Sequence, residues 1–334
     1  MKQLEYQRFM LNLQLFAEPN THTTSSDEMS AEMKTYYNDT LIDIAGPELV
    51  HDQFADKYPI PKNGGKTIEF RRYDNLPPAM TPLEEGVTPS GNKLNVTDFT
   101  ATVEQYGDYV TLSDMLIMTA IDNNIVQATK KLGTQAGLTL DCITRDALCG
   151  GTNVFYAGGV LTRDALTLDC KLERNIFFKV AAFLKKMNAP KIDGKYVAII
   201  HPSISADIMM SDGWIDIQKY QNSKNIFEGE IGELAGIRFV ESSNAKVWKG
   251  EDDGCPDGLA VYGTTVFGAG AYGTTDIAGG GLETIIKQLG SGDDPLNQRA
   301  TVGWKATKVS ERLVEQYMVR IVSCSAESAN EEAN

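Results

Sequence analysis

The sequence predicts an α+β fold, in which strands and helices occupy separate stretches of the chain. Three observations lead to this prediction. Two segments that alternate polar and apolar residues, 67–73 and 97–112, flank a stretch rich in proline and glycine. Apolar residues recur every three or four positions over 113–148, which is typical of a helix. Short strand-like segments separated by glycine turns then run from 225 to 286.

The N-terminal part of the chain is predicted to be an arm over residues 1–38. Its stretch EPNTHTTSSDE, 18–28, is polar and offers few side chains for a core. A helical segment follows at 39–66, with an interruption near Gly46 and Pro47. The whole chain has 334 residues, and single domains seldom exceed about 250–300, so we expect two or more lobes.

The two alternating segments predict a long two-stranded projection over 67–111 with an irregular tip. Prolines and glycines between the strands exclude a helix or a central strand there. An isolated hairpin is marginally stable in water, so we expect its apolar face to stay wet within one chain and to be covered by another. The candidate residues for contacts between subunits are Phe70, Arg71, Arg72, Glu84, Glu85 and Phe99.

The helical run over 113–148 has a clear start and end. Ser113 can cap its first turn, and Gly150 with Gly151 ends it. The helix is either continuous or broken at 122–124. A second helix ends before Pro190, and its predicted apolar face consists of Leu172, Ile176, Val180, Phe183 and Met187.

The rest of the chain is predicted mainly as strands. The sequence YVAIIHPSISADIMM, from 196, indicates a buried strand, a turn and a short helix. Alternation returns in RATVGWKATKVSERLVEQYMVRIVSCS, which starts at Arg299, and the acidic tail 325–334 is expected to fray.

Composition limits the possible partners. The formal net charge of −14 argues against tight binding to nucleic acid or to an anionic membrane, although an acidic wall can still enclose nucleic acid. No apolar run approaches the roughly 18–20 residues that cross a bilayer, and the N-terminus is a poor export signal, which predicts synthesis in the cytoplasm. The five cysteines form no C-x-x-C pair and are expected to be buried, reduced thiols.

One motif suggests chemistry but lacks its structural context. Gly268, Gly270 and Gly273 spell the G-x-G-x-x-G fingerprint of dinucleotide binding, which requires a helix directly after it. The sequence TTDIAGGG follows instead, and its three glycines would break a helix. The acidic turn 251–258 lacks the ligand spacing of a calcium loop. We therefore predict no enzyme, no catalytic residue, no cofactor and no metal site.

Several stretches resemble the major capsid proteins of tailed bacteriophages, which have the Hong Kong 97-type fold. They occur in the same order as in one branch of that family, and the resemblance covers roughly 39–323. These stretches are LEEGVTPSG (83–91), QYGDYVTLSD (105–114), YVAIIHP (196–202), NIFEGEIGELAGIRFVES (225–242), VYGTTVFGAGAYG (261–273) and DDPLNQRATVGWK (293–305).

The resemblance implies a domain plan. It assigns the extended loop to 67–111, a peripheral domain with a long spine helix to 112–188, an axial domain to 189–290, and strands that return to the peripheral domain to 291–324. It places the three fingerprint glycines in a turn of the axial domain.

The resemblance also implies a function. The chain would form hexamers and pentamers of an icosahedral shell that encloses double-stranded DNA without sequence-specific binding, in the virion, after assembly in the host cytoplasm. Because the arm is short, a separate scaffolding protein is expected, together with a portal. No residue here is matched to the Lys–Asn cross-links of some members. The alternative is the shell of a bacterial nanocompartment with a protein cargo.

Overall fold

The fold was obtained as a computed structural model, which describes residues 21–22, 50–73, 76–83, 85–88, 91–119, 124–210, 230–276, 281–291 and 294–334. Most of the predicted arm and residues 39–49 of the predicted helical segment lie outside the described residues. The rest of that segment, 50–66, consists of turns and the short strand β2 (Asp56–Lys57), so the prediction of a helix is wrong for 50–66. The chain divides into two compact units. The first includes 107–136 and 282–305, and the second consists of 46–106, 137–281 and 306–334.

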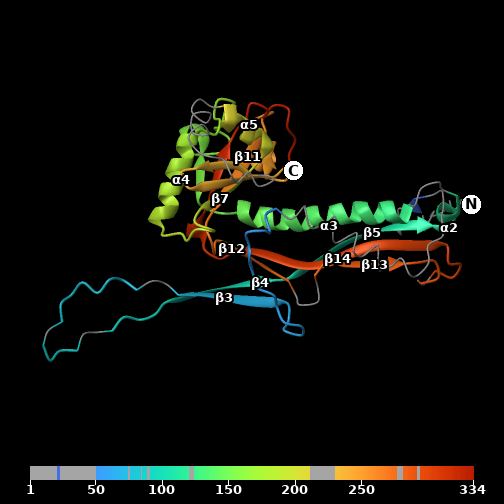
Figure 1. The fold of residues 1–334 in the computed structure, drawn as a ribbon, viewed down its shortest axis with the longest axis horizontal. Helices are drawn as coiled ribbons and strands as arrows, with labels where there is room; N and C mark the ends of the chain where they lie inside the picture. Colours follow the sequence, from blue (N-terminus) through green and yellow to red (C-terminus); the bar gives the residue numbers. More distant parts are fainter. Residues whose placement is uncertain are drawn as a thin grey trace, which may run out of the picture. The chain divides into compact units, whose positions relative to one another are not determined.

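The first unit combines helices with paired strands (Figure 1). Its elements are β1 (Thr21–His22), β5 (Glu104–Ser113), α2 (Asp114–Thr119), α3 (Asn124–Cys149), β13 (Glu283–Lys287) and β14 (Arg299–Arg312), of which β5, α3 and β14 also contribute residues to the second unit. β14 lies between β5 and β13. The buried Trp304 donates its indole N–H to Gln135 on α3, and Gln135 donates to Asp108 on β5. This chain of hydrogen bonds fixes the helix against the strands.

The start and end of the helical region agree with the sequence. The backbone N–H of Leu116 donates to Ser113 Oγ at 3.2 Å, so the predicted cap is confirmed. The region contains two helices, α2 and α3, and residues 120–123 between them lie outside the described residues. α3 ends at Cys149, directly before Gly150.

The predicted strand over 97–112 is in fact two strands with different partners. β4 (Val96–Thr102) pairs antiparallel with β3 (Thr67–Tyr73), whereas β5 begins at Glu104 and lies beside β14. The alternation of buried and exposed side chains that includes Ala101 and Val103 ends at Glu104 and Gln105, which are both exposed, and this break coincides with the change of partner. The boundaries of the arm, loop, peripheral domain and axial domain stay predictions.

The second unit is built around a seven-stranded sheet. Its strand order is β6-β15-β11-β7-β9-β8, and β10 also pairs with β11. The bounds are β6 Val154–Tyr156, β7 Tyr196–Ile200, β8 Glu230–Leu234, β9 Ile237–Glu241, β10 Val247–Trp248, β11 Val261–Phe267 and β15 Met318–Ser323. β15 pairs with β11 on one side and with β6 on the other, and the predicted return of 291–324 to a peripheral domain stays a prediction.

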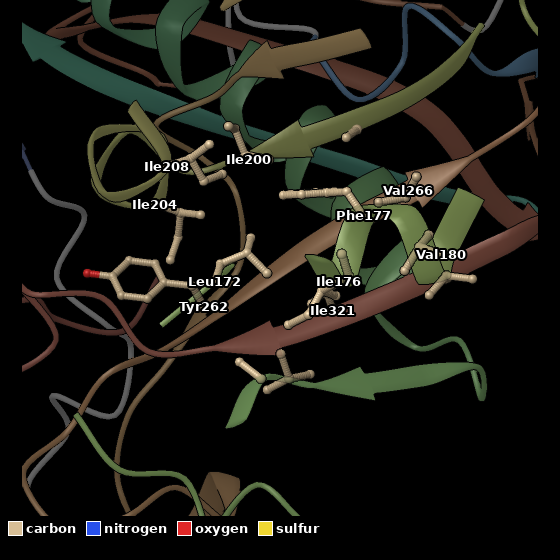
Figure 2. Close-up of a cluster of buried hydrophobic side chains, with 14 of the residues drawn as sticks. Leu172, Ile176, Phe177, Val180, Ile200, Ile204, Ile208, Tyr262, Val266 and Ile321 are labelled. Atoms are coloured by element: carbon tan, nitrogen blue, oxygen red, sulfur yellow. The ribbon is translucent and has the colours of Figure 1, made fainter. Parts of the chain in front are cut away.

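The middle strands of this sheet are buried on both faces. Every residue of β7 and β11 is buried, as the predicted run YVAII indicated. Figure 2 shows side chains of α4 (Arg174–Lys186), α5 (Pro202–Met210), β7, β11 and β15 meeting in one hydrophobic cluster. Tyr196, Ala198 and Ile200 belong to this cluster, whereas Val197 and Ile199 pack into a second cluster with Phe267 and Tyr272.

The buried face of α4 differs from the predicted one. The buried residues are Ile176, Phe177, Val180, Ala181 and Leu184. Phe177 makes an edge-to-face contact with Phe239 of β9, with ring centroids 4.8 Å apart. Ile176 and Val180 belong to both faces, but Phe183 and Met187 are only partly buried. Two apolar stripes overlap on this helix, so spacing alone could not select between them.

The three fingerprint glycines serve turns and close packing. A Cβ on Gly268 would lie 2.3 Å from the carbonyl oxygen of Pro190, and Gly270 has a φ of +69°. Gly273 lies in strand β12 (Tyr272–Thr275) rather than in the expected turn, and its Cβ would lie 3.1 Å from Asp56 O in β2 (Asp56–Lys57). Strand β12 thus begins within the motif and continues to Thr275, at the position where a nucleotide site needs the start of a helix.

The C-terminal tail is packed, so the expectation of fraying is wrong. Ser325 and Ser328 are fully buried, and the N–H of Ala260 donates to Ser328 O at 2.7 Å. Asn334 Oδ1 accepts hydrogen bonds from Arg145 and from the N–H of Val247. Acidic composition alone did not reveal these backbone and side-chain contacts.

All five cysteines lie in the described part of the chain, and all are free. Four are buried and Cys142 is half-buried. Burial raises the pKa of the Cys149 thiol to about 12, so this thiol stays protonated at neutral pH.

The α4 contacts generate a paired test of the core. Phe177→Ala should lower the free energy of unfolding by about 3–5 kcal/mol, because it empties a fully buried site against Phe239. Phe178→Ala is the matched control: Phe178 is 52% exposed, and its loss should cost about 0.5 kcal/mol or less. Urea unfolding of both variants measures the difference, and equal losses would contradict the assigned face.

Candidate assembly surface

The hairpin β3–β4 forms a sheet of its own. Its strands pair antiparallel in register from Thr67 opposite Thr102 to Tyr73 opposite Val96. Among the described residues, neither strand pairs with any third strand, so each has an open edge. The connecting segment continues beyond the strands as an open loop (Figure 1).

The base of the hairpin is covered by its own chain. The rings of Phe70 and Phe99 stack with centroids 5.3 Å apart, and Tyr58 packs edge-on against Phe70 at the same distance. Ala101 and Val103 are buried. The expectation that the whole apolar face stays wet is therefore wrong for the base. Tyr58 lies just after β2, where its N–H donates to Thr274 O, and this contact anchors the aromatic stack.

The hairpin tip, defined as the described residues within 73–96, exposes apolar side chains. Seven of them are 46–84% exposed: Tyr73, Leu76, Met80, Leu83, Val87, Leu94 and Val96. Single exposed apolar residues are common on proteins, but a run of this density marks an interaction surface. The tip is therefore the candidate site for contact with another molecule.

The charged residues predicted to contact another subunit are exposed where the structure describes them. Arg71 Nε donates to Glu69 on its own strand at 2.8 Å, and both side chains are exposed. This pairing raises the pKa of Arg71, first through the hydrogen bond and then through the charge of Glu69. Arg72 and Glu85 are exposed, with no ion pair to another described residue. Glu84 lies outside the described residues.

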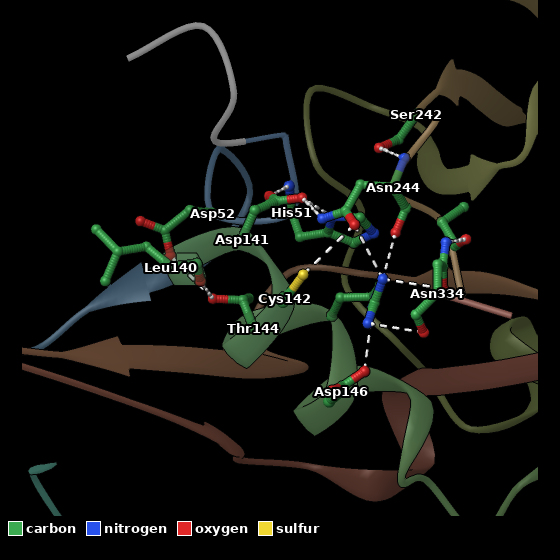
Figure 3. A network of polar contacts seen from close by, with 12 residues as sticks. His51, Asp52, Leu140, Asp141, Cys142, Thr144, Asp146, Ser242, Asn244 and Asn334 are labelled. Carbon is green, nitrogen blue, oxygen red and sulfur yellow. Dashed lines mark hydrogen bonds and ion pairs between the residues drawn. The ribbon is translucent and has the colours of Figure 1, made fainter. Parts of the chain in front are cut away.

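A buried polar network holds the segment that leads into the hairpin (Figure 3). His51 Nδ1 lies 2.7 Å from Asp141 Oδ2, and the His51 N–H donates to Asp141 Oδ1 at 2.8 Å. Asn244 Nδ2 donates to the same carboxylate at 2.7 Å. Next along the segment, Asp52 forms a 2.7 Å ion pair with Lys308 of β14. No local sequence pattern marks this network, because its members are far apart in the chain.

The electrostatics of Asp141 follow from these contacts. Burial alone would raise its pKa, because His51 and Asp141 are both almost fully buried. The hydrogen bonds and charge of His51 and the hydrogen bond of Asn244 outweigh burial, so the pKa of Asp141 lies below its ordinary value. The carboxylate is thus held as a charged anchor on α3. Arg145, one helical turn after Asp141 on α3, donates hydrogen bonds to Asn244 and to Asn334. These bonds connect the C-terminal tail to the same helix.

The described residues contain no group of three or more His, Cys, Asp or Glu side chains placed to hold a metal ion. His201, directly after strand β7, has Nδ1 3.1 Å from Ser203 Oγ, and the same nitrogen accepts a hydrogen bond from the Ser203 N–H. Within the described part of the chain, no helix is long and apolar enough to span a bilayer.

Comparisons with known proteins agree on one group. A family model described as phage capsid protein matches residues 97–312. The capsid of Ralstonia phage GP4 matches with a TM-score of 0.64 and 15% identity, over 85% of this chain and 90% of that one. The cyanophage Pam1 capsid matches with a TM-score of 0.65 and 11% identity, over 95% and 100%. The capsid of Helicobacter pylori bacteriophage KHP30 gives 0.57 and 10%, over 97% and 99%. No curated protein sequence matches the chain.

These matches confirm the predicted α+β fold and its resemblance to phage capsid proteins. At such low identity, the solved structures indicate the fold alone, and the family assignment rests on the family model.

The buried pair predicts a pH-dependent stability. Asp141→Asn should cost about 3 kcal/mol at neutral pH, because it removes the buried carboxylate that His51 and Asn244 contact and leaves their polar groups without a full set of partners. Since the folded-state pKa of Asp141 is lowered, its contribution is complete above the ordinary value of 3.8 and is lost as the pH falls through the folded-state pKa. The difference in the free energy of unfolding between wild type and Asp141→Asn should therefore become smaller below about pH 4.

Asp146→Asn on the same helix is the control, because the Asp146 side chain is 55% exposed and its ion pairs should contribute about 1 kcal/mol or less. Chemical unfolding across pH measures both variants. The role of the pair of His51 and Asp141 would be contradicted if the loss of unfolding free energy in Asp141→Asn did not change with pH. It would also be contradicted if Asp141→Asn and Asp146→Asn lost equal amounts.

Proposed function

The chain belongs to the phage capsid protein family, and we propose that it assembles as hexamers and pentamers into an icosahedral shell around double-stranded phage DNA. It is a structural component of the virion and not an enzyme. The order of six sequence stretches, from LEEGVTPSG to DDPLNQRATVGWK, supports the finer proposal.

The observation that carries the proposal is the exposed apolar surface of the hairpin tip. Specific protein interfaces bury about 1,600 Å² in total, with apolar side chains at their centre. A neighbouring copy of the chain can cover the tip, and the same contact repeated head to tail around an axis closes a ring. We assign the extended loop to β3–β4 with its tip.

We also propose which elements form the spine, the peripheral domain and the axial domain. We assign the spine to α3, the peripheral domain to the first unit together with that helix, and the axial domain to the region of the seven-stranded sheet. Phe70 and Phe99 would stiffen the loop base, whereas Arg72, Glu84 and Glu85 would make charged contacts between subunits. Exposed ion pairs contribute only about 0–1 kcal/mol each, so the apolar tip supplies most of the contact energy. A scaffolding protein and a portal are the expected helpers in assembly.

Two matched double variants test the tip. Met80→Ser with Leu83→Ser removes side chains that are 84% and 77% exposed in the single chain, so the subunit should keep its melting temperature. Burying each side chain in an interface contributes about 1.5 kcal/mol or more, so the concentration needed for shell assembly should rise about 100-fold. Leu161→Ser with Met210→Ser changes side chains that are 88% and 80% exposed outside the tip, and it should leave assembly near wild type.

Light scattering and electron microscopy measure the outcome, with the cognate scaffold present where it is required. Normal particles from the tip variant would contradict the assignment. A tip variant that no longer folds would show that the loop belongs to the core of the subunit. Replacing residues 74–96 by an Asn-Gly turn provides a second, more severe version of the same test.

A further inference from the structure

The stretch around helix α4 has a net positive charge, whereas the whole chain is negative. Residues 171–195 contain seven Lys or Arg and two Asp or Glu, whereas the whole chain contains 31 against 45. The cations are Lys171, Arg174, Lys179, Lys185, Lys186, Lys191 and Lys195. An acidic protein therefore has a local excess of basic side chains on one helix and the loop after it.

The packing of α4 turns its lysines to solvent. The helix buries Phe177 and its neighbours on the seven-stranded sheet, so one side is occupied. Lys179 and Lys186 lie seven residues apart, which places them about 10.5 Å apart along the opposite side. Lys185 is also exposed, and Ala182 between them keeps that side open. We name Lys179, Lys185 and Lys186 the α4 basic face.

The charges of this face are not neutralised within the described part of the chain. Lys195 pairs with Glu233 at 2.7 Å, but no ion pair joins the three lysines of the face to another described residue. The last turn of a helix favours cations, which accounts for Lys185 and Lys186. It does not account for Lys179 in the middle of the helix, or for Lys191 beyond its end.

We propose that the α4 basic face contacts the phosphate backbone of the enclosed double-stranded DNA, an inference that rests on the proposed function. Lysine is a compact point charge, which suits contacts with phosphates that carry no sequence information. The net charge of −14 opposes DNA binding by the chain as a whole, so a contact with phosphates is most favourable where cations gather locally. A few lysines per subunit give weak, reversible contacts that many copies repeat.

The test compares two triple variants of the free subunit with equal loss of charge. The first is Lys179→Gln, Lys185→Gln and Lys186→Gln. The control is Lys130→Gln, Lys131→Gln and Lys287→Gln, which are also exposed. Fluorescence anisotropy with a short random-sequence DNA duplex, over about 50–200 mM salt, gives the affinity and its salt dependence. Poly-glutamate provides a rival acidic probe, and thermal unfolding confirms that each variant is folded.

We expect the α4 variant to lose at least about tenfold in DNA affinity at the lowest salt, with a salt slope reduced by about 2 to 3, and the control to change less than about twofold. Equal effects in both variants, or no DNA binding by the wild type, would overturn the inference. Loss of poly-glutamate binding with unchanged DNA affinity would overturn it in favour of an acidic protein partner. Electron microscopy separates this inference from the proposed shell function. If shells form but DNA binding does not depend on the α4 basic face, this inference is contradicted and the shell function is not.

Discussion

A two-stranded sheet buries too little apolar surface to be stable by itself, and β3–β4 meets this constraint in two different ways. At the base, Tyr58 and the stacked rings of Phe70 and Phe99 cover the apolar face within the same chain. Toward the tip this cover ends, and apolar side chains such as Met80 and Leu83 are exposed. The base is therefore covered within the chain, whereas the tip is open to another molecule. In the proposed shell, a neighbouring copy of the chain is that molecule.

The core and the hairpin are connected through polar contacts. His51 and Asp52 precede the hairpin in sequence and are tied to Asp141 on α3 and to Lys308 on β14. Removing one partner of a buried pair leaves an uncompensated charge, so such pairs fix one arrangement. Tyr58 follows on the same segment and packs on Phe70, so the position of the hairpin base depends on this anchor. The C-terminal residues reach the same helix through Arg145 and Asn334.

Local features were predictable, whereas contacts between distant segments were not. The cap at Ser113 and the buried strand at Tyr196–Ile200 follow from short-range rules of hydrogen bonding and conformation, and the structure confirms both. The exchange of partner at Val103, the buried face of α4 and the packed tail depend on which segments meet in three dimensions. The pair of His51 and Asp141 spans 90 residues, and no local pattern marks it. The exposed tip was expected from its prolines, but the self-covered base was not.

The most direct test of the account is the reactivity of Met80 toward peroxide in free subunits and in assembled particles. In the single chain this side chain is 84% exposed, so its thioether should oxidise as readily as in an unfolded peptide. If a neighbouring subunit covers the tip, oxidation in closed particles should slow by about tenfold or more, in line with burial of the sulfur at an interface. Equal oxidation rates in free subunits and in particles would show that the tip stays in solvent and would contradict the account.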